Sequence, residues 1–535
     1  MTAFDYIIVG AGSAGCVLAW ELSQDPDITV LVVEAGGSDR SLWIRTPVGY
    51  GKSYFDPRVN WMFETEPDPA TGGRRGYWPR GKVLGGSSSI NALIWFRGLP
   101  HDFDDWEAAG AAGWGRAEVQ RQYEAMERRI DPEGNRQGAG RVVVSDPLHD
   151  LHPSTRHYFA MARELGLPLT DDCNGAECEG ITHYRLTTRR GRRWSAANAY
   201  LHPALRRPNV TLVSKALVER VRIENRRATG ITALHRGARM TFQARREVIL
   251  AAGAVNSPKL LQLSGIGPGA HLAAMGIEVV ADNPHVGGHL QDHLGVNYNY
   301  RATEPTLNSQ LAPMWGKLWH GMRYALTRHG PVSLSVNQCG GFLRSRPDLA
   351  HPDVQIYLNP ITYRLEPGKR QMIIPDPWPG FILSFQPCRP RSRGRIDIAS
   401  PDPEAPPRIV PNYLSDAADL DDVIAGGRLV QRMARSASIG AFAQEAQGPD
   451  ITRLDDEGIL EDFRARCGTV FHPVGTCRMG REGEAVTGPD LRVHGIERLR
   501  VVDASSFPNI TSGNTNAPVM MLAQRAAGLI RAARP

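Results

Sequence analysis

Apolar and polar positions near the N-terminus predict one β-α-β unit. An apolar run at residues 6–9 indicates a buried strand, and a helical pattern follows at residues 12–22. A second apolar run, residues 29–33, indicates a second strand that ends at Glu34. Because the glycine-rich turn separates strand from helix, the first forty residues are typical of a nucleotide-binding unit.

The turn of this unit carries the spacing GxGxxG at Gly10, Gly12 and Gly15. The first glycine permits the turn, the second lets the backbone approach a pyrophosphate, and the third allows the helix to pack on the strand. Glu34, 19 positions after Gly15, is expected to accept hydrogen bonds from an adenosine ribose. The remaining expected contacts of this unit are Ser13, Ala14 and Ala35. A solvated carboxylate at the strand end is the alternative for Glu34, and the unit alone leaves NAD and FAD both open.

Residues 296–460 show a different pattern, in which short alternating runs are separated by proline and glycine. Such runs predict antiparallel strands. They lie at residues 353–360, 381–390 and 394–400. Two stretches rich in polar residues, proline or glycine, 301–315 and 364–380, are expected to be loops that gate a pocket.

Composition indicates an ordinary folded protein of more than one domain. The 535 residues exceed the length at which single cores stop growing, and 41% are hydrophobic while 22% are charged. The net charge of +6, from 62 basic and 56 acidic residues, is too small an excess to favour a nucleic-acid partner. The densest basic run, residues 188–194, is expected to be a solvated loop that helps to attract acidic substrates.

Cysteine usage and hydropathy bear on location. Seven widely spread cysteines and a start without the pattern of a signal peptide favour a reducing cytoplasm. No apolar stretch approaches the roughly 18 to 20 residues of a membrane span, so no transmembrane segment is expected, and peripheral membrane contact is left open.

A glycine-serine stretch at residues 79–98 offers a second site rich in backbone N–H groups. Gly81, Gly85 and Gly86 are followed by three serines, which suits a phosphate or a polar ring edge. A flexible linker is the alternative, but the apolar residues from Ile90 to Phe96 lead the loop into a buried segment. This stretch and residues 253–267, 287–295, 471–480 and 499–530 resemble the sequence signatures of the glucose-methanol-choline (GMC) family of FAD-dependent oxidoreductases.

The resemblance implies an α/β protein with a Rossmann-like FAD-binding domain and a substrate domain that has helices and an antiparallel sheet. The FAD-binding domain is expected to combine residues 1–155, 205–295 and 460–535. The substrate domain is expected to combine residues 156–204 and 296–459.

The resemblance also implies which residues hold FAD. Gly10, Gly12, Gly15 and Glu34 would hold its ADP half, and Val218 would contact adenine. The residues expected around the pyrophosphate and isoalloxazine are Arg80, Gly81, Val83, Gly85, Gly86, Asn91, Ala92, Gly253 and Asn516. Asp503 and Ala504 would lie near the ribityl chain. Some choline-oxidising relatives bind FAD covalently through a histidine where this chain has Ile90, so dissociable FAD is expected.

His472 is the candidate base. A neutral imidazole accepts a proton at working pH, and Pro473 and Gly475 place it in a tight turn. A metal site would need more ligands than the nearby Cys477, so no metal is expected, and a structural histidine remains an alternative. The resemblance implies that His472 is catalytic and that Asn514 donates a hydrogen bond to the substrate oxygen.

The expected reaction is oxidation of a primary alcohol to an aldehyde, with hydride transfer to flavin N5 and His472 as general base. Electrons would then pass to oxygen or to a quinone-like or protein carrier. The alternatives are a choline-type oxidoreductase and a non-redox enzyme of the hydroxynitrile lyase type. An NAD-dependent dehydrogenase would explain only the first forty residues. Five aromatic residues could line an apolar channel or belong to the core: Phe342, Tyr357, Trp378, Phe381 and Phe471.

Overall fold

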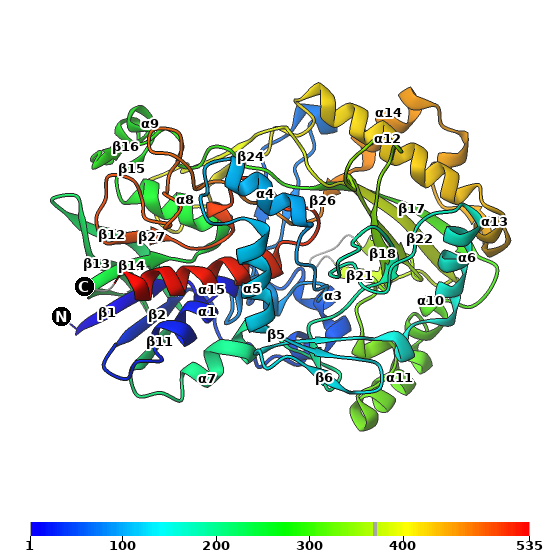
Figure 1. The fold of residues 1–535 in the computed structure, drawn as a ribbon, viewed down its shortest axis with the longest axis horizontal. Coiled ribbons are helices and arrows are strands. Elements are labelled where there is room, and N and C mark those ends of the chain that lie inside the picture. The colour runs from blue at the N-terminus through cyan, green and yellow to red at the C-terminus, as the bar shows by residue number, and fades with distance from the viewer. Residues whose placement is uncertain (1, 367–371, 534–535) are drawn as a thin grey trace.

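The computed structural model describes residues 2–366 and 372–533. The molecule is elongated, with one large sheet near each end (Figure 1). Among the described residues, no helix is both long and apolar enough to cross a membrane.

The first sheet has seven strands in the order β11-β2-β1-β14-β13-β12, with β27 paired to β14. Strands β1, β2, β11, β14 and β27 run parallel, while β12 and β13 extend the sheet as an antiparallel meander. Their bounds are β1 Thr2–Val9, β2 Val30–Glu34, β11 Val210–Ser214, β12 Ala216–Glu224, β13 Arg227–His235, β14 Ala238–Leu250 and β27 Leu499–Val501. Helix α1, Ser13–Leu22, connects β1 to β2, which confirms the predicted β-α-β unit.

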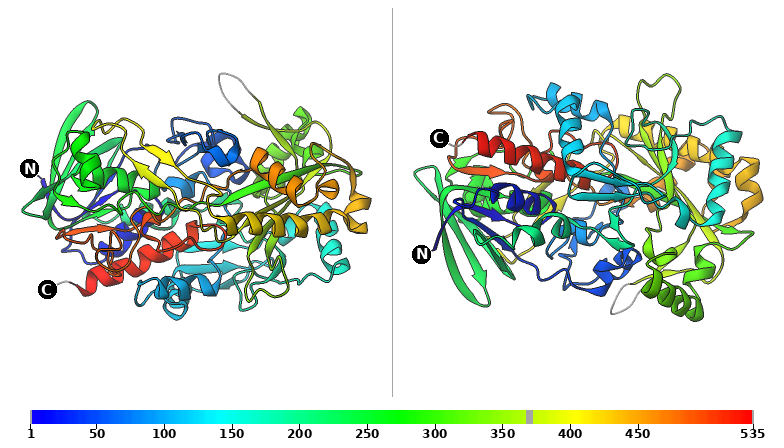
Figure 2. Two further views of the ribbon diagram at one scale, coloured as in Figure 1. Left: turned by 90° about the horizontal axis from the view of Figure 1, so that it is seen from above. Right: turned by 60° about the horizontal axis from the view of Figure 1, so that its bottom comes forward.

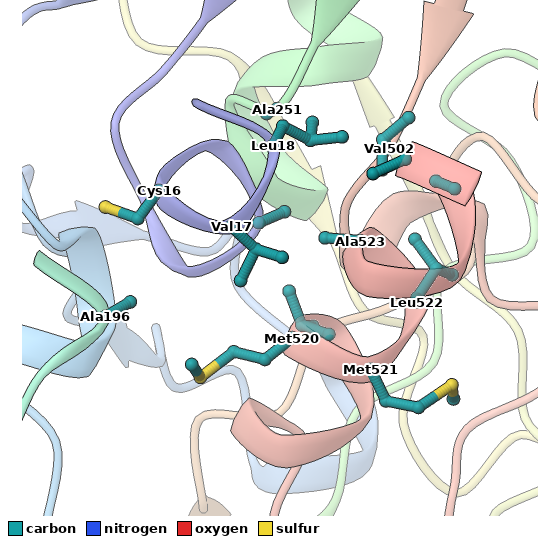
Figure 3. Packing of buried hydrophobic residues seen from close by; sticks show 14 of the residues in the cluster. Cys16, Val17, Leu18, Ala196, Ala251, Val502, Met520, Met521, Leu522 and Ala523 are labelled. Carbon is teal, nitrogen blue, oxygen red and sulfur yellow. The ribbon is translucent and has the colours of Figure 1, made fainter. Parts of the chain in front are cut away.

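Helix α1 packs against the C-terminal helix α15, Asn516–Ala532, in the largest apolar cluster. Figure 3 shows Val17 of α1 facing Met520 and Ala523 of α15, and Leu18 of α1 pointing towards Val502. This packing brings the start of α15 to the glycine turn, where the Ser13 hydroxyl donates to the Asn516 side-chain oxygen at 2.8 Å. The two ends of the chain therefore form one wall of the cavity described below.

The second sheet has six antiparallel strands in the order β18-β19-β22-β17-β25, with β26 paired to β17. Their bounds are β17 Leu294–Ala302, β18 Cys339–Leu343, β19 Val354–Asn359, β22 Gly380–Pro387, β25 Ala443–Ala446 and β26 Gly468–Thr469. Helix α12, Ala417–Ala434, packs on β22. The predicted strands at 353–360 and 381–390 are β19 and β22. The predicted strand at 394–400 is β23, Arg395–Asp397, which pairs only with β24, Arg408–Val410, outside this sheet.

The prediction of a loop at residues 301–315 is wrong for most of that stretch. It holds the end of β17 and helix α10, Leu307–Leu311, which a capping box between Thr306 and Ser309 begins. Helix α11, Met314–Thr327, follows at once. A second loop was predicted at residues 364–380, and its residues 367–371 lie outside the described residues. The strands before and after them, β20, Tyr363–Glu366, and β21, Met372–Pro375, pair with each other.

The strands of the first sheet lie within the segments expected for the FAD-binding domain, but the second sheet also takes β26 and the start of β17 from those segments. Strands of the first sheet come from residues 2–34, 210–250 and 499–501. The second sheet draws on residues 294–302 and 339–387, with two short strands near 445 and 468. The domain boundaries themselves stay a prediction.

Candidate active site

One cavity of about 1550 Å³ extends from the first sheet to the second. Gly10 and Glu34, at the carboxyl ends of β1 and β2, line it from one sheet, and Tyr357 of β19 lines it from the other. Ligands of open parallel sheets bind at this end of the strands. The cavity is therefore the candidate site.

The structure brings most of the predicted cofactor residues to this cavity. Its lining includes Gly10, Gly12, Ser13, Ala14, Glu34, Ala35, Arg80, Gly81, Gly86, Asn91, Ala92, Val218, Gly253, Asp503, Ala504 and Asn516. His472 and Asn514 line it as well. Gly15, Val83 and Gly85 are not among the lining residues.

These three residues lie behind the cavity wall. A Cβ on Gly15 would be 1.9 Å from the Gly10 carbonyl oxygen, so this glycine permits close packing of α1 on the turn, as its position in the motif predicts. Val83 is fully buried in a small apolar cluster. Gly85 has a φ of +86° and turns the chain towards Gly86.

Two glycine loops meet where a pyrophosphate is expected. A Cβ on Gly86 would lie 2.7 Å from the Cα of Gly12, so the loops touch backbone to backbone. Helix α1 begins after Gly12 with no side-chain cap, and its first N–H groups are at the cavity wall. The positive end of a helix beside a glycine cradle suits an anionic phosphate.

Glu34 is a fixed, buried acceptor with 7% of its surface exposed. Its Oε2 accepts from the Ala11 N–H at 2.8 Å, and its Oε1 accepts from the Gly36 N–H at 2.7 Å. Burial raises the pKa of Glu34. The alternative of a solvated carboxylate is therefore wrong, and the remaining lone pairs suit ribose hydroxyls at the cavity wall.

Asp503 connects the segments that follow β14 and β27 at the cavity wall. Its Oδ2 accepts from the Gly253 N–H at 2.8 Å and from the Ser257 hydroxyl at 2.6 Å. Gly253 and Ser257 belong to helix α8, Gly253–Leu263, which follows β14. The carboxylate therefore fixes the start of α8 against the end of β27.

The basic run at residues 188–194 is only partly solvated. Arg193 is buried, and its guanidinium donates to the Asn91 side-chain and backbone oxygens, both at 2.7 Å. Asn91 lines the cavity, so Arg193 positions a predicted cofactor contact. Arg190 and Arg192 are exposed.

The loop after β26 presents His472 under backbone strain. Phe471, just before it, has a φ of +71°, a conformation that costs a non-glycine residue free energy. The Thr469 hydroxyl accepts from the Phe471 N–H at 2.8 Å, and Arg80 donates to the Phe471 carbonyl oxygen at 2.7 Å. The Asp292 carboxylate accepts from the His472 N–H at 2.8 Å. These contacts hold the strained turn in place.

Hydrogen bonds on both ring nitrogens assign one tautomer to His472. The Asn514 amide Nδ2, which can only donate, lies 3.2 Å from His472 Nε2. His472 Nδ1 lies 3.0 Å from His293 Nδ1, and His293 Nε2 lies 2.6 Å from the Cys388 carbonyl oxygen. Because a carbonyl can only accept, His293 carries its proton on Nε2 and accepts at Nδ1. His472 therefore carries its proton on Nδ1, and its Nε2 is a free base.

The electrostatic environment keeps this base neutral. Burial, then the nearby His293 and Arg80, hold the pKa of His472 well below its usual value. Burial also lowers the pKa of His293 to about 4. Both rings are therefore neutral at pH 7. No three histidine, cysteine, aspartate or glutamate side chains in the described ranges gather as ligands for a metal ion.

A second set of buried amides orients Asn514. The Gln355 amide donates to the Asn514 side-chain oxygen at 3.4 Å. The Gln355 oxygen in turn accepts from the Tyr357 hydroxyl at 2.9 Å and from the Gln386 amide at 3.0 Å. This network directs the Asn514 NH₂ group to His472 and the cavity.

Sequence reasoning missed His293, Asp292 and Gln355. His293 and Asp292 lie within residues 287–295, a segment that resembles a family signature, and this was the available signal. Their partner His472 is 179 residues from His293 in sequence, so no local pattern connects them.

The five aromatic candidates divide between cavity and core. Tyr357 and Phe471 line the cavity. Phe342 and Phe381 are fully buried in the apolar clusters, so the channel role is wrong for them. Trp378 is partly exposed and does not line the cavity.

Comparison with known proteins decides the family. A family model described as GMC oxidoreductase matches residues 4–295, and a second of the same description matches residues 390–523. The chain belongs to the GMC oxidoreductase family. The resemblance and the enzyme class predicted from the sequence are therefore confirmed.

Full-length relatives and a solved structure agree with this assignment. An alcohol dehydrogenase (acceptor) of Pseudomonas putida is 39% identical over 539 residues, covering 98% of this chain and 95% of the relative. An oxygen-dependent choline dehydrogenase of Brucella ovis is 39% identical over 537 residues, covering 99% and 96%. A formate oxidase of Aspergillus oryzae RIB40, solved in a study of FAD modification, is 26% identical and superposes with a TM-score of 0.90, covering 99% and 98%. The predicted fold class of this GMC oxidoreductase is confirmed.

Proposed function

We propose that this GMC oxidoreductase oxidises an uncharged primary alcohol to an aldehyde, with dissociable FAD as cofactor and His472 as the base. The observation that carries the proposal is the unprotonated Nε2 of a neutral, buried imidazole, which accepts from the Asn514 amide at the cavity wall. The alcohol dehydrogenase relative supports the reaction class.

The residues present fit FAD. The glycine cradle suits the pyrophosphate, Glu34 suits the adenosine ribose, and Asp503 lies where the ribityl chain is expected. FAD, when bound, supplies the ring that accepts a hydride from the alcohol carbon. Ile90 lines the cavity where some relatives carry a histidine, and its hydrocarbon side chain cannot form a covalent bond to the cofactor.

The chain's own groups handle the proton. His472 Nε2 takes the hydroxyl proton, and Asn514 Nδ2 donates to the substrate oxygen as negative charge develops on it. The ring then carries protons on both nitrogens, and the Nδ1–H remains hydrogen-bonded to His293. The accepting His293 therefore keeps the Nδ1–H of His472 hydrogen-bonded while the ring carries the second proton.

The charges around the cavity favour an uncharged substrate. Among the described residues, the carboxylates that line it are Glu34 and Asp503, which both lie on the first sheet's side and accept from backbone N–H groups. Lys317, Arg328 and Arg466 line its other parts. A choline-type cation would need a carboxylate beside aromatic rings. Choline is the second candidate, because the Brucella ovis relative is named for it.

Anaerobic mixing with substrate tests the proposal. Primary alcohols should bleach the flavin absorbance of the purified, FAD-loaded protein, with choline less effective than an apolar alcohol of the same size. A hydroxynitrile lyase-like enzyme would leave the absorbance unchanged. Reoxidation with oxygen and, separately, with a quinone-like dye identifies the class of electron acceptor, and release of FAD on acid denaturation tests dissociability.

A further inference from the structure

Helix α11 presents a row of large apolar side chains to solvent. Half of the large apolar residues that are exposed in the described part of the chain lie on this one helix. They are Met314, Trp315, Leu318, Trp319, Met322 and Leu326, with exposed fractions between 53% and 79%. We call these six side chains the apolar face of α11. An exposed apolar patch of this kind marks an interaction surface.

The apolar face is not needed to attach the helix. Only Gly316 and Tyr324 of α11 are buried, and the Tyr324 hydroxyl donates to the Gly191 carbonyl oxygen at 2.9 Å. At 3.6 residues per turn, the six apolar side chains cover an arc of about 140°, away from these anchors. The fold therefore holds α11 from one side and leaves the apolar face outside.

The apolar face borders the opening of the cavity. Gly321 and Tyr324, on the adjacent side of α11, line the cavity. Leu42, Trp43 and Leu365 also line it, with 67%, 46% and 58% of their surfaces exposed. Helix α11 lies at the lower edge of the molecule in Figure 1 and in the right view of Figure 2. The cavity is thus lined by exposed apolar side chains near α11, and we call these residues and the apolar face the apolar rim.

The chain segment that contains α11 carries an excess of positive charge. No aspartate or glutamate occurs from residue 305 to residue 347. Arg323 on α11 is exposed, as are Arg190 and Arg192, in the hairpin of β9, Thr188–Arg189, and β10, Arg192–Arg193. The Tyr324 hydroxyl bond to Gly191 places this hairpin against α11. The hairpin thus packs on the anchored side of α11, and Arg323 is the basic residue next to the apolar face.

We propose that the apolar face of α11 docks this protein on an anionic lipid membrane, with the cavity opening towards the lipid. Tryptophan, leucine and methionine side chains enter the boundary between headgroups and acyl chains, as in helices that lie in the membrane interface. The arginines bind lipid phosphates.

The same charges argue against a second copy of the chain as occupant. In a two-fold contact through α11, the positive charge near the apolar rim of one copy would face the same charge on the other. An anionic surface is attracted by this charge instead. If the proposed function also holds, an apolar alcohol dissolved in the membrane reaches the cavity without crossing water.

Sedimentation with lipid vesicles tests the docking without using activity. The FAD-loaded protein is mixed with vesicles of phosphatidylcholine and phosphatidylglycerol in equal parts, and with vesicles of phosphatidylcholine alone. The variants are Trp315→Ser/Trp319→Ser and Arg190→Glu/Arg323→Glu. The matched control is Val279→Ser, an exposed apolar residue between α9, Gly269–Ala274, and β16, Ala281–Asp282, at the opposite end of the molecule.

The wild type and the control should bind the mixed vesicles, and added salt should weaken this binding. The tryptophan variant should bind both vesicle types at least ~10-fold more weakly. The arginine variant should bind the mixed vesicles about 10-fold more weakly, or weaker still, and should bind the phosphatidylcholine vesicles like wild type. Bound FAD and the melting temperature confirm that each variant is folded. Wild-type protein that ignores both vesicle types, or variants that bind like wild type, would overturn the proposal. A wild-type dimer that the tryptophan variant converts to a monomer, without vesicle binding, would assign the face to a second copy.

Discussion

His472 Nδ1 lies 3.0 Å from His293 Nδ1, and both rings are buried and neutral. Since only one of these two nitrogens can carry the shared proton, the carbonyl of Cys388 on the far side of His293 decides which one does. The Cys388 carbonyl, which is two hydrogen bonds away from His472, thus determines that Nε2 is the basic nitrogen of His472. His293 is a positioning residue.

We predict that His293→Ala slows flavin reduction by alcohol roughly 5- to 150-fold, because a buried Nδ1–H without an acceptor costs about 1–3 kcal/mol. FAD content should not change. His293→Gln, whose amide oxygen can accept, should recover part of the rate. A merely structural role for His293 would leave the pH profile of the reduction rate unshifted, so the rate is measured from pH 5 to pH 9.

Substitutions at Asn514 and Asn516 should distinguish an effect on the rate of flavin reduction from an effect on cofactor binding. Asn514→Asp removes the donor to His472 and the substrate oxygen and places a carboxylate near the developing negative charge. It should lower the reduction rate by about 10² to 10³-fold, the scale of losing one oxyanion donor. Asn516→Ala is the matched comparison, since it removes the contacts with Ser13 and Met520 and an expected FAD contact, but no donor to His472. Equal rate losses in both variants would contradict the assigned roles.

Glu34→Gln should weaken FAD retention with little effect on the loaded enzyme. The neutral amide would replace the charged acceptor that the ribose hydroxyls need, and a hydrogen bond to a charged group contributes about 1.5–3 kcal/mol, or roughly 10- to 150-fold in Kd. Fluorescence titration of the apoprotein with FAD measures this change. Glu497→Gln, at an exposed ion pair, is the control and should bind FAD like wild type. Unaltered affinity in Glu34→Gln would show that the carboxylate has no part in the site.

Stability should fall on acidification between the ordinary histidine pKa of 6.5 and about 4. The unfolded chain takes up a proton at His293 in this range while the folded chain does not, so protonation favours unfolding as the pH falls. At about pH 5 the loss is roughly 2 kcal/mol for this one residue. Chemical denaturation at pH 7 and pH 5 measures it, and His293→Gln should show a smaller difference than wild type. An equal pH dependence in both proteins would place His293 in contact with solvent.

The parts of the fold that the sequence predicts are those with local determinants. The β-α-β unit is complete within residues 2–34, and the packing of Gly15 on the Gly10 turn is local. Helix α10 was missed because its start depends on the Thr306–Ser309 capping box, hidden in a polar stretch. The strand β23 was predicted correctly, but its pairing with β24 depends on tertiary structure, which the alternation of apolar and polar residues does not reveal.

The candidate site shows the same division. His472 and Asn514 could be proposed from their motifs, but the His293 and Gln355 contacts that orient them depend on pairing between distant segments. Phe342 and Phe471 look alike in sequence, yet one packs in the core while the other lines the cavity. Which side of a strand or turn faces the cavity is decided by the packing of the two sheets.

The most direct test of the account is the anaerobic rate of flavin reduction by a saturating primary alcohol in the His472→Ala variant, measured by stopped flow on protein with full FAD content. Loss of the base should slow reduction by at least ~10²-fold while FAD stays bound. Reduction at a near-normal rate would show that His472 Nε2 is not the group that takes the hydroxyl proton.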